Sequence, residues 1–227
     1  QIHHVRGRNN TATGFTADTF EQVTAADPTQ IIAVNQAVDA RTKGSLEEIA
    51  PTTVKPNGYE DWQVPWEKQV ETIADAVGKK DEGDKLIDDT EKAFEEFRHE
   101  HAELQDKSAA IVMPYDGKIG LYTEEDGRGQ FIENLGMEIP DALQGDGGSF
   151  FVDIAPENYA KLNQVDYLFV LDYNGSSDVL KKDKTFQGLD IVKDDRVRYL
   201  DTDTGNAMSM PNPVTIPWAV DKFEEKL

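Results

Sequence analysis

The sequence of 227 residues contains no cysteine. This absence excludes disulfide bonds, thiolate metal sites and cysteine nucleophiles, and it suits a secreted protein as well as a cytosolic one. No apolar run approaches the roughly 20 residues that span a bilayer, and no signal peptide begins the chain. The opening, QIHHVRGRNNTATGF, reads like the middle of a longer protein. We therefore expect that a leader or a lipid anchor once preceded residue 1.

Basic residues are scarce, because acids outnumber Lys and Arg by 44 to 23 and the formal net charge is −21. A nucleic-acid binder must neutralise phosphates with clustered basic side chains. The balance therefore argues against nucleic-acid binding and against electrostatic adhesion to an anionic membrane. A heavily solvated surface is the simplest reason for the acidity. The hydrophobic fraction of 38% is enough for a globular core.

Histidines and catalytic motifs are also few. His3 and His4 lie in a terminus that we expect to fray, while His99 and His101 are two residues apart on a predicted helix. Residues at that spacing do not share a helix face, so we expect surface histidines and not metal ligands. The sequence has no nucleophile elbow, Walker loop or H-E-x-x-H motif. These absences predict no catalytic residue and no metal site.

Two short segments resemble ligand loops without meeting their requirements. In DTDTGN, residues 201–206, Gly205 occupies a position where a calcium ligand belongs, and no glutamate follows at the twelfth position. In GDGGS, residues 145–149, no strand–loop–helix context supports a phosphate cradle. We interpret the second segment as a flexible loop and reject both as sites.

The first half of the chain alternates helical and strand-like segments. Residues 19–34 read as a helix that leads through a proline into the short buried strand IIAV. Ser45 is the expected N-cap of the next helix, with Glu48 completing a capping box and Leu46 and Ile49 facing inward. A second strand-like segment, APTTVKP, follows. Strand, helix, strand is the rhythm of an α/β layer.

Two amphipathic helices come next. The first begins near Pro65, and its apolar residues recur at helical spacing: Trp66, Val70, Ile73 and Val77. Residues 79–104 then read as one helix with a second set of apolar residues on its buried side: Leu86, Ile87, Phe94, Phe97 and Leu104. At 1.5 Å per residue, about 24 residues span roughly 36 Å. Such a helix either joins two α/β regions rigidly or packs on one domain.

The second half reads as a complete α/β lobe from about Ser108. A hairpin is predicted at YDGK, because Asp-Gly favours tight turns. A short helix stopped by Gly136, the helix PENYAKLN, the strand DYLFVLDY, an alternating strand and a final helix follow. The first half has too few strands for an independent sheet, so we expect its opening strand and helix to be missing.

Aromatic, basic and sulfur-containing residues gather in the predicted loops between strands and helices. For each of them local packing is the simpler role, but open α/β sheets bind ligands at this edge, and two lobes meeting there would form a cleft. The candidates are Trp62, Tyr115, Tyr122, Arg128, Met208 and Ser209.

Several ordered segments together resemble one family. They are FEQVTAADPTQIIAV, SLEEIAPTTV, PWEKQVETIADAVGK, GRGQFIENLGM, IAPENYAKLNQVDYLFVLD, FQGLDIVKDDRVRYLD and PWAVDKFEEKL. From about Thr19 to its end, the chain resembles iron–siderophore substrate-binding proteins, in the helical-backbone class of ABC-importer receptors that also includes cobalamin and haem binders. The resemblance implies two Rossmann-like α/β lobes joined by one long helix: a partial N-terminal lobe over 1–79, the helix over 80–107 and a C-terminal lobe over 108–227.

The resemblance also implies a function. The protein is expected to be a monomeric, non-enzymatic receptor, periplasmic or anchored by lipid at the cell surface, that binds a ferric siderophore between its lobes and delivers it to an ABC importer. The siderophore itself coordinates the iron, so neither a cofactor nor protein metal ligands are expected. Alternatives are a haem or corrinoid binder, a scaffold or sensor without transport, and an enzyme, against which the absent cysteines and the histidine placement argue.

Site residues follow from the resemblance as well. Trp62 and Tyr122 match positions of ligand-contacting aromatics, and Arg128 matches a loop arginine that could pair with an anionic ferric complex. Tyr115, Met208 and Ser209 remain loop candidates, the last two in the matching late cleft loop. From the first lobe, the resemblance adds Arg41 and Lys43.

Two glutamates have a different implied role. Glu21 and Glu157 lie ten and eleven residues before the core positions Ile31 and Leu168, near the starts of predicted helices. In the family, glutamates in these segments contact arginines of the importer's membrane subunits, which is a charge-complementary docking contact. Each glutamate could also simply favour its helix N-terminus through the helix dipole.

Overall fold

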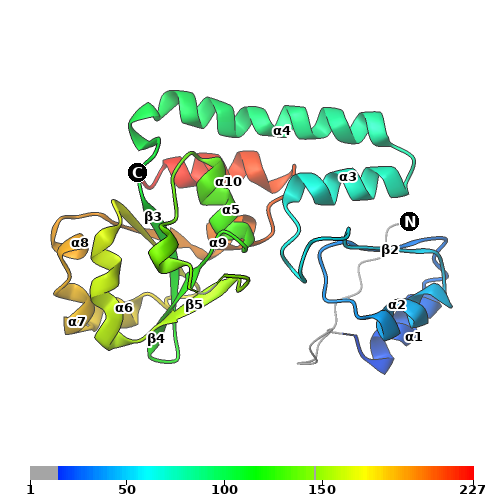
Figure 1. Cartoon of the computed structure of the whole chain (residues 1–227), viewed down its shortest axis with the longest axis horizontal. Helices are drawn as coiled ribbons and strands as arrows, with labels where there is room; N and C mark the ends of the chain where they lie inside the picture. Colours follow the sequence, from blue (N-terminus) through cyan, green and yellow to red (C-terminus); the bar gives the residue numbers. More distant parts are fainter. Residues whose placement is uncertain (1–14, 146) are drawn as a thin grey trace. The chain divides into compact units, whose positions relative to one another are not determined.

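The computed structural model describes residues 15–145 and 147–227 (Figure 1). The chain divides into two compact units, one ending at Asp84 and the other running from Lys85 to Leu227. The division falls inside the long helix α4 (Lys80–Glu100). Within the described ranges, no helix is both long and apolar enough to cross a membrane.

The first unit is a small α/β layer. Strands β1 and β2 pair in parallel, with Ile31 opposite Thr52 and Ala33 opposite Val54. A parallel pair needs a crossover connection, and here α2 supplies it. The elements are α1 (Ala17–Ala25), β1 (Ile31–Ala33), α2 (Ala40–Glu47), β2 (Thr52–Val54), α3 (Trp66–Ala76) and the first turn of α4.

The predicted start of α2 is wrong. The helix begins at Ala40, and Ser45 lies inside it and not at its N-cap. Asp39 is the cap: its side chain accepts a hydrogen bond from the Thr42 backbone N–H at 2.7 Å. Aspartate is among the strongest N-cap residues, so this earlier cap determines where the helix starts, and the capping-box pattern at Ser45 has no such role.

Helical periodicity also overestimates burial. Four side chains that we expected to be buried are exposed: Ile32 by 40%, Ile73 by 38%, Val77 by 48% and Leu86 by 45%. In α4 the predicted burial of Phe94 and Phe97 is confirmed, and Thr90 is buried with them. One turn before Leu86, Gly83 packs closely against Ala74 of α3.

The second unit is built on a mixed sheet of strand order β5-β4-β3-β6-β7. Strands β3, β6 and β7 are parallel, while β4 and β5 extend the sheet antiparallel. The predicted hairpin is confirmed, with Asp116 and Gly117 at φ of 45° and 73° in its turn. The elements are η1 (Ala102–Leu104), β3 (Ala109–Tyr115), β4 (Lys118–Tyr122), α5 (Gly127–Asn134), η2 (Asp141–Leu143), β5 (Phe151–Ile154), η3 (Pro156–Gln164), β6 (Tyr167–Asp172), α6 (Asp178–Lys182), α7 (Lys184–Gln187), α8 (Asp190–Lys193), β7 (Val197–Asp201), α9 (Thr202–Ser209) and α10 (Thr215–Glu224).

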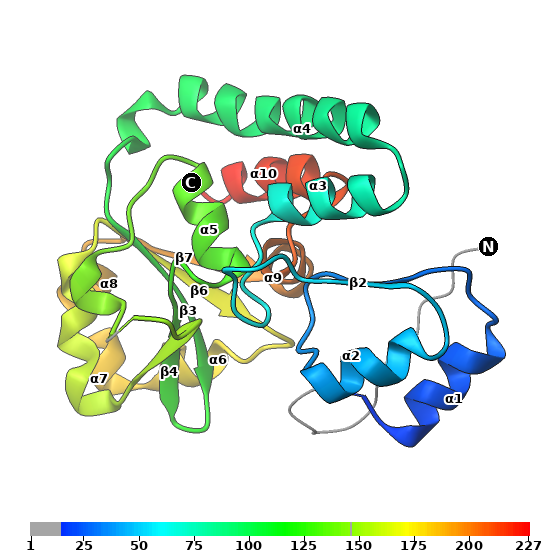
Figure 2. The ribbon, with the colours of Figure 1, turned by 45° about the vertical axis from the view of Figure 1, so that its right-hand side comes forward.

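Helices cover both faces of this sheet, as Figure 2 shows for α5, α9 and α10 on one side and α6, α7 and α8 on the other. On the second side, Leu168 and Val170 of β6 belong to a continuous apolar cluster with Phe186 of α7. On the first side, Phe223 of α10 packs on Phe169 of β6 with ring centroids 4.6 Å apart. The predicted C-terminal α/β layer is therefore present, with its core between sheet and helices.

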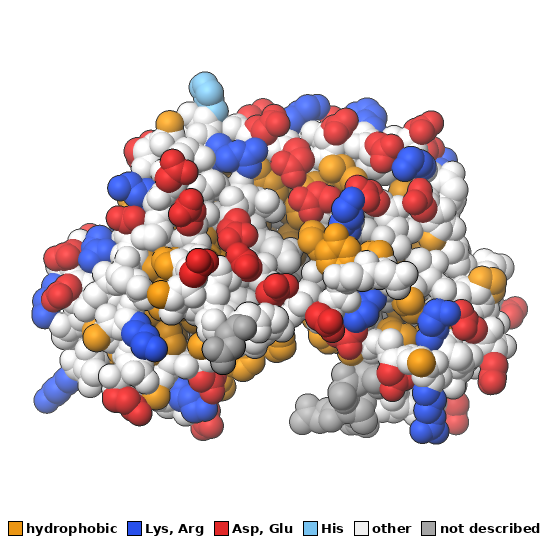
Figure 3. All heavy atoms as spheres, in the orientation of Figure 1, with side chains coloured by type: hydrophobic (Ala, Val, Ile, Leu, Met, Phe, Trp, Pro, Cys, Tyr) orange, Lys and Arg blue, Asp and Glu red, His pale blue; other side chains and the backbone are white. Residues whose placement is uncertain are grey.

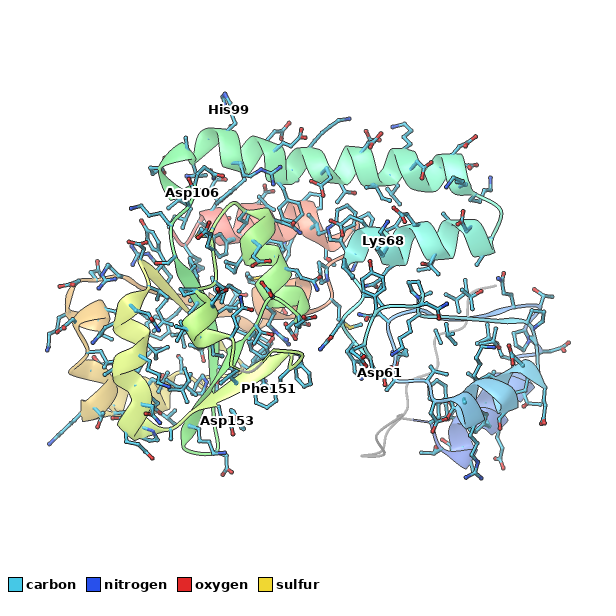
Figure 4. The ribbon with its side chains drawn as sticks, viewed as in Figure 1. Asp61, Lys68, His99, Asp106, Phe151 and Asp153 are labelled. Atoms are coloured by element: carbon cyan, nitrogen blue, oxygen red, sulfur yellow. The ribbon has the colours of Figure 1, made fainter. Side chains whose placement is uncertain are left out.

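Of the two described histidines, only one is a freely exposed surface residue. His99 points away from the ribbon (Figure 4). The ring of His101 instead lies 4.6 Å from that of Phe97, and its Nε2 is 2.9 Å from Glu224 Oε1. Burial lowers the pKa of His101, but hydrogen bonds with Glu224 and Glu103 outweigh it and leave the pKa raised. The expectation of two surface histidines is thus corrected for His101, which connects the end of α4 to α10.

Two helical glycines give a matched test of packing in the first unit. A Cβ added at Gly83 would lie 2.4 Å from the Ala74 Cβ, whereas one at Gly44 would meet nothing within 4 Å. We expect Gly44→Ala to raise the free energy of unfolding by about 0.5–1 kcal/mol through helix propensity. Gly83→Ala should lower it by about 1–3 kcal/mol, because α3 and α4 must separate. Urea denaturation of both variants checks this, and changes of the same sign would contradict it.

Candidate functional site

One side of the antiparallel part of the second unit's sheet carries aromatic residues. Directly opposed residues share a face, and the register opposes Met113 to Gly120 and Tyr122 to Phe151. Alternation along β3 places Tyr115 on the same side as Met113. We call these five residues, Met113, Tyr115, Gly120, Tyr122 and Phe151, the aromatic face. Figure 4 shows Phe151 on β5, at the edge of the sheet.

Gly120 gives the aromatic face its shape. A Cβ at this position would lie 3.0 Å from the Tyr115 ring and 3.4 Å from the Phe151 ring. Because glycine has no side chain, the Tyr115 and Phe151 rings can approach each other over it. They form an edge-to-face contact with centroids 6.1 Å apart. A favourable aromatic pair is therefore held over the centre of the face.

At the hairpin end, a charged pair borders the aromatic face. The Tyr115 hydroxyl donates a hydrogen bond to Asp153, and Lys118 Nζ lies 2.7 Å from the other oxygen of the same carboxylate. Asp153 is marked beside Phe151 in Figure 4. The hydrogen bonds from Lys118 and then from Tyr115 lower the pKa of Asp153. Lys118 is thus already paired.

At the other end, Arg128 covers Tyr122. The guanidinium carbon lies 4.1 Å from the centroid of the Tyr122 ring, a cation–π contact. Arg128 Nη1 is 2.9 Å and 3.0 Å from the two Asp126 oxygens. Asp126 is also the N-cap of α5, accepting a hydrogen bond from the Arg128 backbone N–H at 2.8 Å. Helix start, ion pair and ring stack hold the guanidinium in one place.

The pair is largely buried, with the side chain of Arg128 only 16% exposed and that of Asp126 13% exposed. Burial raises the pKa of Asp126 more than Arg128 lowers it. Burial acts to lower the pKa of Arg128, but Asp126 and then Tyr122 outweigh it, so that pKa is raised. Removal of one partner would leave the other charge buried and uncompensated, which is strongly destabilising.

Unused hydrogen-bonding groups surround this pair. Arg128 Nε and the Tyr173 hydroxyl are buried without a hydrogen-bond partner in the described structure. Tyr173 follows the carboxyl end of β6, and Gly205 of α9 lets its ring approach: a Cβ there would lie 2.9 Å from the hydroxyl. Buried polar groups are normally paired. Tyr173 is also among the groups that interact with the Arg128 charge, so the two side chains lie together at the candidate site.

The start of α5 also contacts the segment after α9. A Cβ at Gly127 would lie 2.8 Å from both the Ser209 carbonyl oxygen and the Pro211 ring. The structure thus brings the Ser209 backbone beside the Arg128 loop. Ser209 itself donates to the Asn206 carbonyl at 2.9 Å. The Met208 side chain is fully buried, so it packs in the core and presents no surface to a ligand.

The remaining candidates belong to the first unit. Trp62 is 43% exposed, with a φ of 69° that is unusual for a bulky residue. Arg41 is exposed near the start of α2, and Lys43 forms an ion pair with Glu47 one turn later. The ligand-binding role of Trp62, Arg41 and Lys43 stays a prediction.

Three residues of the site were missed in the sequence. Asp126 carries a readable signal, because an aspartate before Gly-Arg-Gly is a strong helix N-cap. Tyr173 follows an apolar strand directly, at the edge where such sheets bind ligands. Phe151 has no comparable signal, since only the pairing of β4 with β5 places it beside Gly120.

A shallow depression lies between α9 and α10, with a volume of about 430 Å³. Its apolar part includes Trp218 and Met210, which are 40% and 48% exposed. The lining residues are Asp203, Asn206, Ala207, Met210, Asn212, Thr215 and Trp218. This segment had been expected to contribute Met208 to a ligand; its exposed methionine is Met210.

Residues 11–204 match the family model described as periplasmic binding protein. The chain belongs to the periplasmic binding protein family. Among curated protein sequences, none matches it.

Solved structures of this fold support the assignment. PiaA from Streptococcus pneumoniae in complex with ferrichrome is 24% identical, over 91% of this chain and 71% of that chain, with a TM-score of 0.77. A periplasmic solute binding protein from Mycobacterium smegmatis is also 24% identical, over 91% and 70%, with a TM-score of 0.78. FhuD2 from Staphylococcus aureus with bound ferrioxamine B is 19% identical, over 92% and 79%, with a TM-score of 0.69. The expected two-lobed α/β fold is thereby confirmed.

The described part of this periplasmic binding protein contains no group of three His, Cys, Asp or Glu side chains that could hold a metal ion. His3 and His4 lie outside the described residues. Charges are interspersed on the surface that Figure 3 shows, where Asp and Glu alternate with Lys and Arg. Against this background of exposed charges, the largely buried guanidinium of Arg128, stacked on Tyr122, distinguishes the candidate site.

Glu133 of α5 makes the stability of this binding protein depend on pH. Burial, with the nearby carboxylates of Glu124 and Glu138, raises its pKa from 4.5 to about 7. Between these values the unfolded chain loses the proton while the folded protein keeps it, so the free energy of unfolding falls as pH rises through this window.

We expect Glu133→Gln to remove this loss. Because Glu133 is partly exposed, the variant should gain only about 1–2 kcal/mol over the wild type between about pH 4 and about pH 8. Urea denaturation at both pH values measures the difference. The control Glu100→Gln, at an exposed position of α4, should follow the wild type. A pH dependence in Glu133→Gln equal to that of the wild type would refute the assignment.

Proposed function

We propose that this protein binds a ferric siderophore outside the cytoplasm and delivers it to an ABC importer. The observation that carries the proposal is the Arg128 guanidinium, stacked on Tyr122 at the aromatic face and held there by Asp126. The family supports a binding role and an extracytoplasmic location. Relatives of the same fold have been solved with ferrichrome and with ferrioxamine B.

The chemistry of the aromatic face suits such a ligand. The partly exposed rings of Tyr115 and Phe151 offer apolar surface to the carbon skeleton of a chelate, while the buried ring of Tyr122 supports Arg128. The Arg128 side chain, which is 16% exposed, is proposed to donate to the oxygen atoms around the iron. Charge-assisted hydrogen bonds of this kind are roughly twice as strong as neutral ones. The siderophore holds the iron, so the protein needs no metal ligand of its own.

Residues of both lobes are proposed to contact the ligand. Trp62, Arg41 and Lys43 would approach the ligand from the N-terminal lobe, while Ser209 would do so beside Arg128. The domain limits at residues 79 and 107 are part of the same proposal, as is a monomeric state. Haem or a corrinoid, a role without transport, and catalysis are the alternatives that binding measurements distinguish.

Intrinsic tryptophan fluorescence offers a direct test, since the chain has three tryptophans. We expect saturable quenching by at least one ferric siderophore and none by haem or cobalamin. Arg128→Lys should weaken that binding by about tenfold or more, because lysine keeps the charge beside Asp126 but loses the planar stack and the second donor edge.

A matched control is Arg198→Lys on β7, where the guanidinium donates only to backbone carbonyls of its own strand end and of Leu227. This variant should bind like the wild type. Quenching by haem or cobalamin alone would replace the siderophore with that ligand. No quenching by any of these compounds would favour a role without transport.

Docking to the importer is proposed to use Glu21 and Glu157. Both side chains are exposed, Glu21 on α1 and Glu157 at the start of η3. Exposed carboxylates can form charge-complementary contacts with arginines of membrane subunits, which mainly govern association and specificity. We expect the double variant Glu21→Ala/Glu157→Ala to keep its ligand affinity and to lose most uptake in a cell-based iron transport assay.

The control for docking is the double variant Glu48→Ala/Glu96→Ala, which removes two other exposed glutamates and the same total charge. It should transport like the wild type. Normal uptake by Glu21→Ala/Glu157→Ala would show that these residues do not dock the importer. An equal loss in both double variants would point to net charge and not to these two positions.

A further inference from the structure

The charges bordering the aromatic face cancel. Its two cations are Lys118 and Arg128, and each is paired with one carboxylate, Asp153 and Asp126 respectively. Strands β3, β4 and β5 carry no other Lys or Arg. The loop from β4 to α5 adds two further acids, Glu124 and Glu125, and no base. The face therefore offers a ligand no surplus positive charge.

Ferric chelates differ widely in charge. Three hydroxamates each lose one proton on binding iron(III), so a ferric trihydroxamate core is uncharged. Three catechols each lose two protons, and the complex is triply anionic. A receptor for the second class must provide several unpaired cations, because a polyanion that leaves water needs compensation at close range.

We propose that the Asp126–Arg128 pair makes this site selective for ferric complexes without net negative charge, with ferric trihydroxamates as the ligand class, against polyanionic ferric complexes. The inference rests on the proposed function and specifies its substrate. In it, Arg128 donates hydrogen bonds to the chelate, while Asp126 is a positioning residue that also sets the charge of the site.

Asp126 cannot easily leave the pair when a ligand arrives. Its carboxylate binds Arg128 Nη1 through both oxygens and caps α5 as well. Displacement would therefore leave a buried carboxylate uncompensated and would remove a helix cap. A polyanion at the aromatic face would therefore leave water without gaining an unpaired cation, because the charge of Arg128 is already compensated by Asp126.

The bases predicted in the first unit do not change this balance by themselves. Lys43 is paired with Glu47, and Arg41 lies two residues after Asp39, which caps the same helix. Lys43 thus has an acid beside it, as each base of the aromatic face does, while Arg41 is exposed and its charge is screened by solvent.

The test compares ferrichrome, an uncharged ferric trihydroxamate, with a triply anionic ferric tris-catecholate, by fluorescence quenching at fixed ionic strength. The wild type should bind ferrichrome about 100-fold more tightly or better, because the triply anionic complex loses its hydration without gaining an unpaired cation at the aromatic face. Asp126→Asn should reduce this preference by about tenfold or more, because it removes the carboxylate that neutralises Arg128. The preference is the ratio of the two affinities measured on the same variant, so the test does not require an unchanged affinity for ferrichrome. Asparagine is also a good N-cap, so the start of α5 is retained.

The matched control is Glu125→Gln, which removes one negative charge from the next residue without touching the ion pair. It should keep the wild-type preference. The inference is overturned if the wild type binds the tris-catecholate as tightly as ferrichrome, if Asp126→Asn leaves the preference unchanged, or if Glu125→Gln changes it equally. The wild-type ratio decides alone if Asp126→Asn does not fold. Binding of neither complex, or of haem only, would instead refute the proposed function, and this inference with it.

Discussion

The ion pair between Asp126 and Arg128 is the interaction on which the candidate site depends. One carboxylate starts α5, neutralises the guanidinium and fixes it over Tyr122. The sheet supplies the other half of the site, because its register places Tyr122, Gly120 and the two rings beside Gly120 on one side. Arg128 is therefore positioned both by the N-cap of α5 and by the strand register that places Tyr122 beneath it. The chemistry of the aromatic face depends on these two contacts.

The protein as a whole is strongly acidic, yet its site is balanced. With a formal net charge of −21, an unpaired arginine would attract anions in competition with a repulsive surrounding field. Pairing with Asp126 cancels the net charge of Arg128, while the N–H groups of the guanidinium keep their directions. Recognition can then depend on where acceptor oxygens lie and on how well rings and carbon skeleton fit, and less on charge attraction over distance.

The sequence predicted the α/β alternation, the long helix and the Asp-Gly hairpin, because each depends on local chemistry. It also supplied Tyr115, Tyr122 and Arg128 as candidates, which the structure brings to one side of the sheet. It could not reveal which apolar residues are buried: Leu86 and Val77 satisfy helical periodicity but face solvent. Nor could it place Phe151 beside Tyr115, which needs strands β3, β4 and β5 side by side. His101 was misjudged because its partner, Glu224, is more than 120 residues away in the chain.

The double duty of Asp126 limits how the protein can diversify. Most replacements at this position would weaken the first turn of α5 along with the ion pair, so they would be lost through poor folding before altered binding could matter. Asparagine and serine still cap a helix, but either would leave Arg128 buried without its counter-charge. A change in the charge of this site is therefore expected to need a second, compensating substitution near position 126.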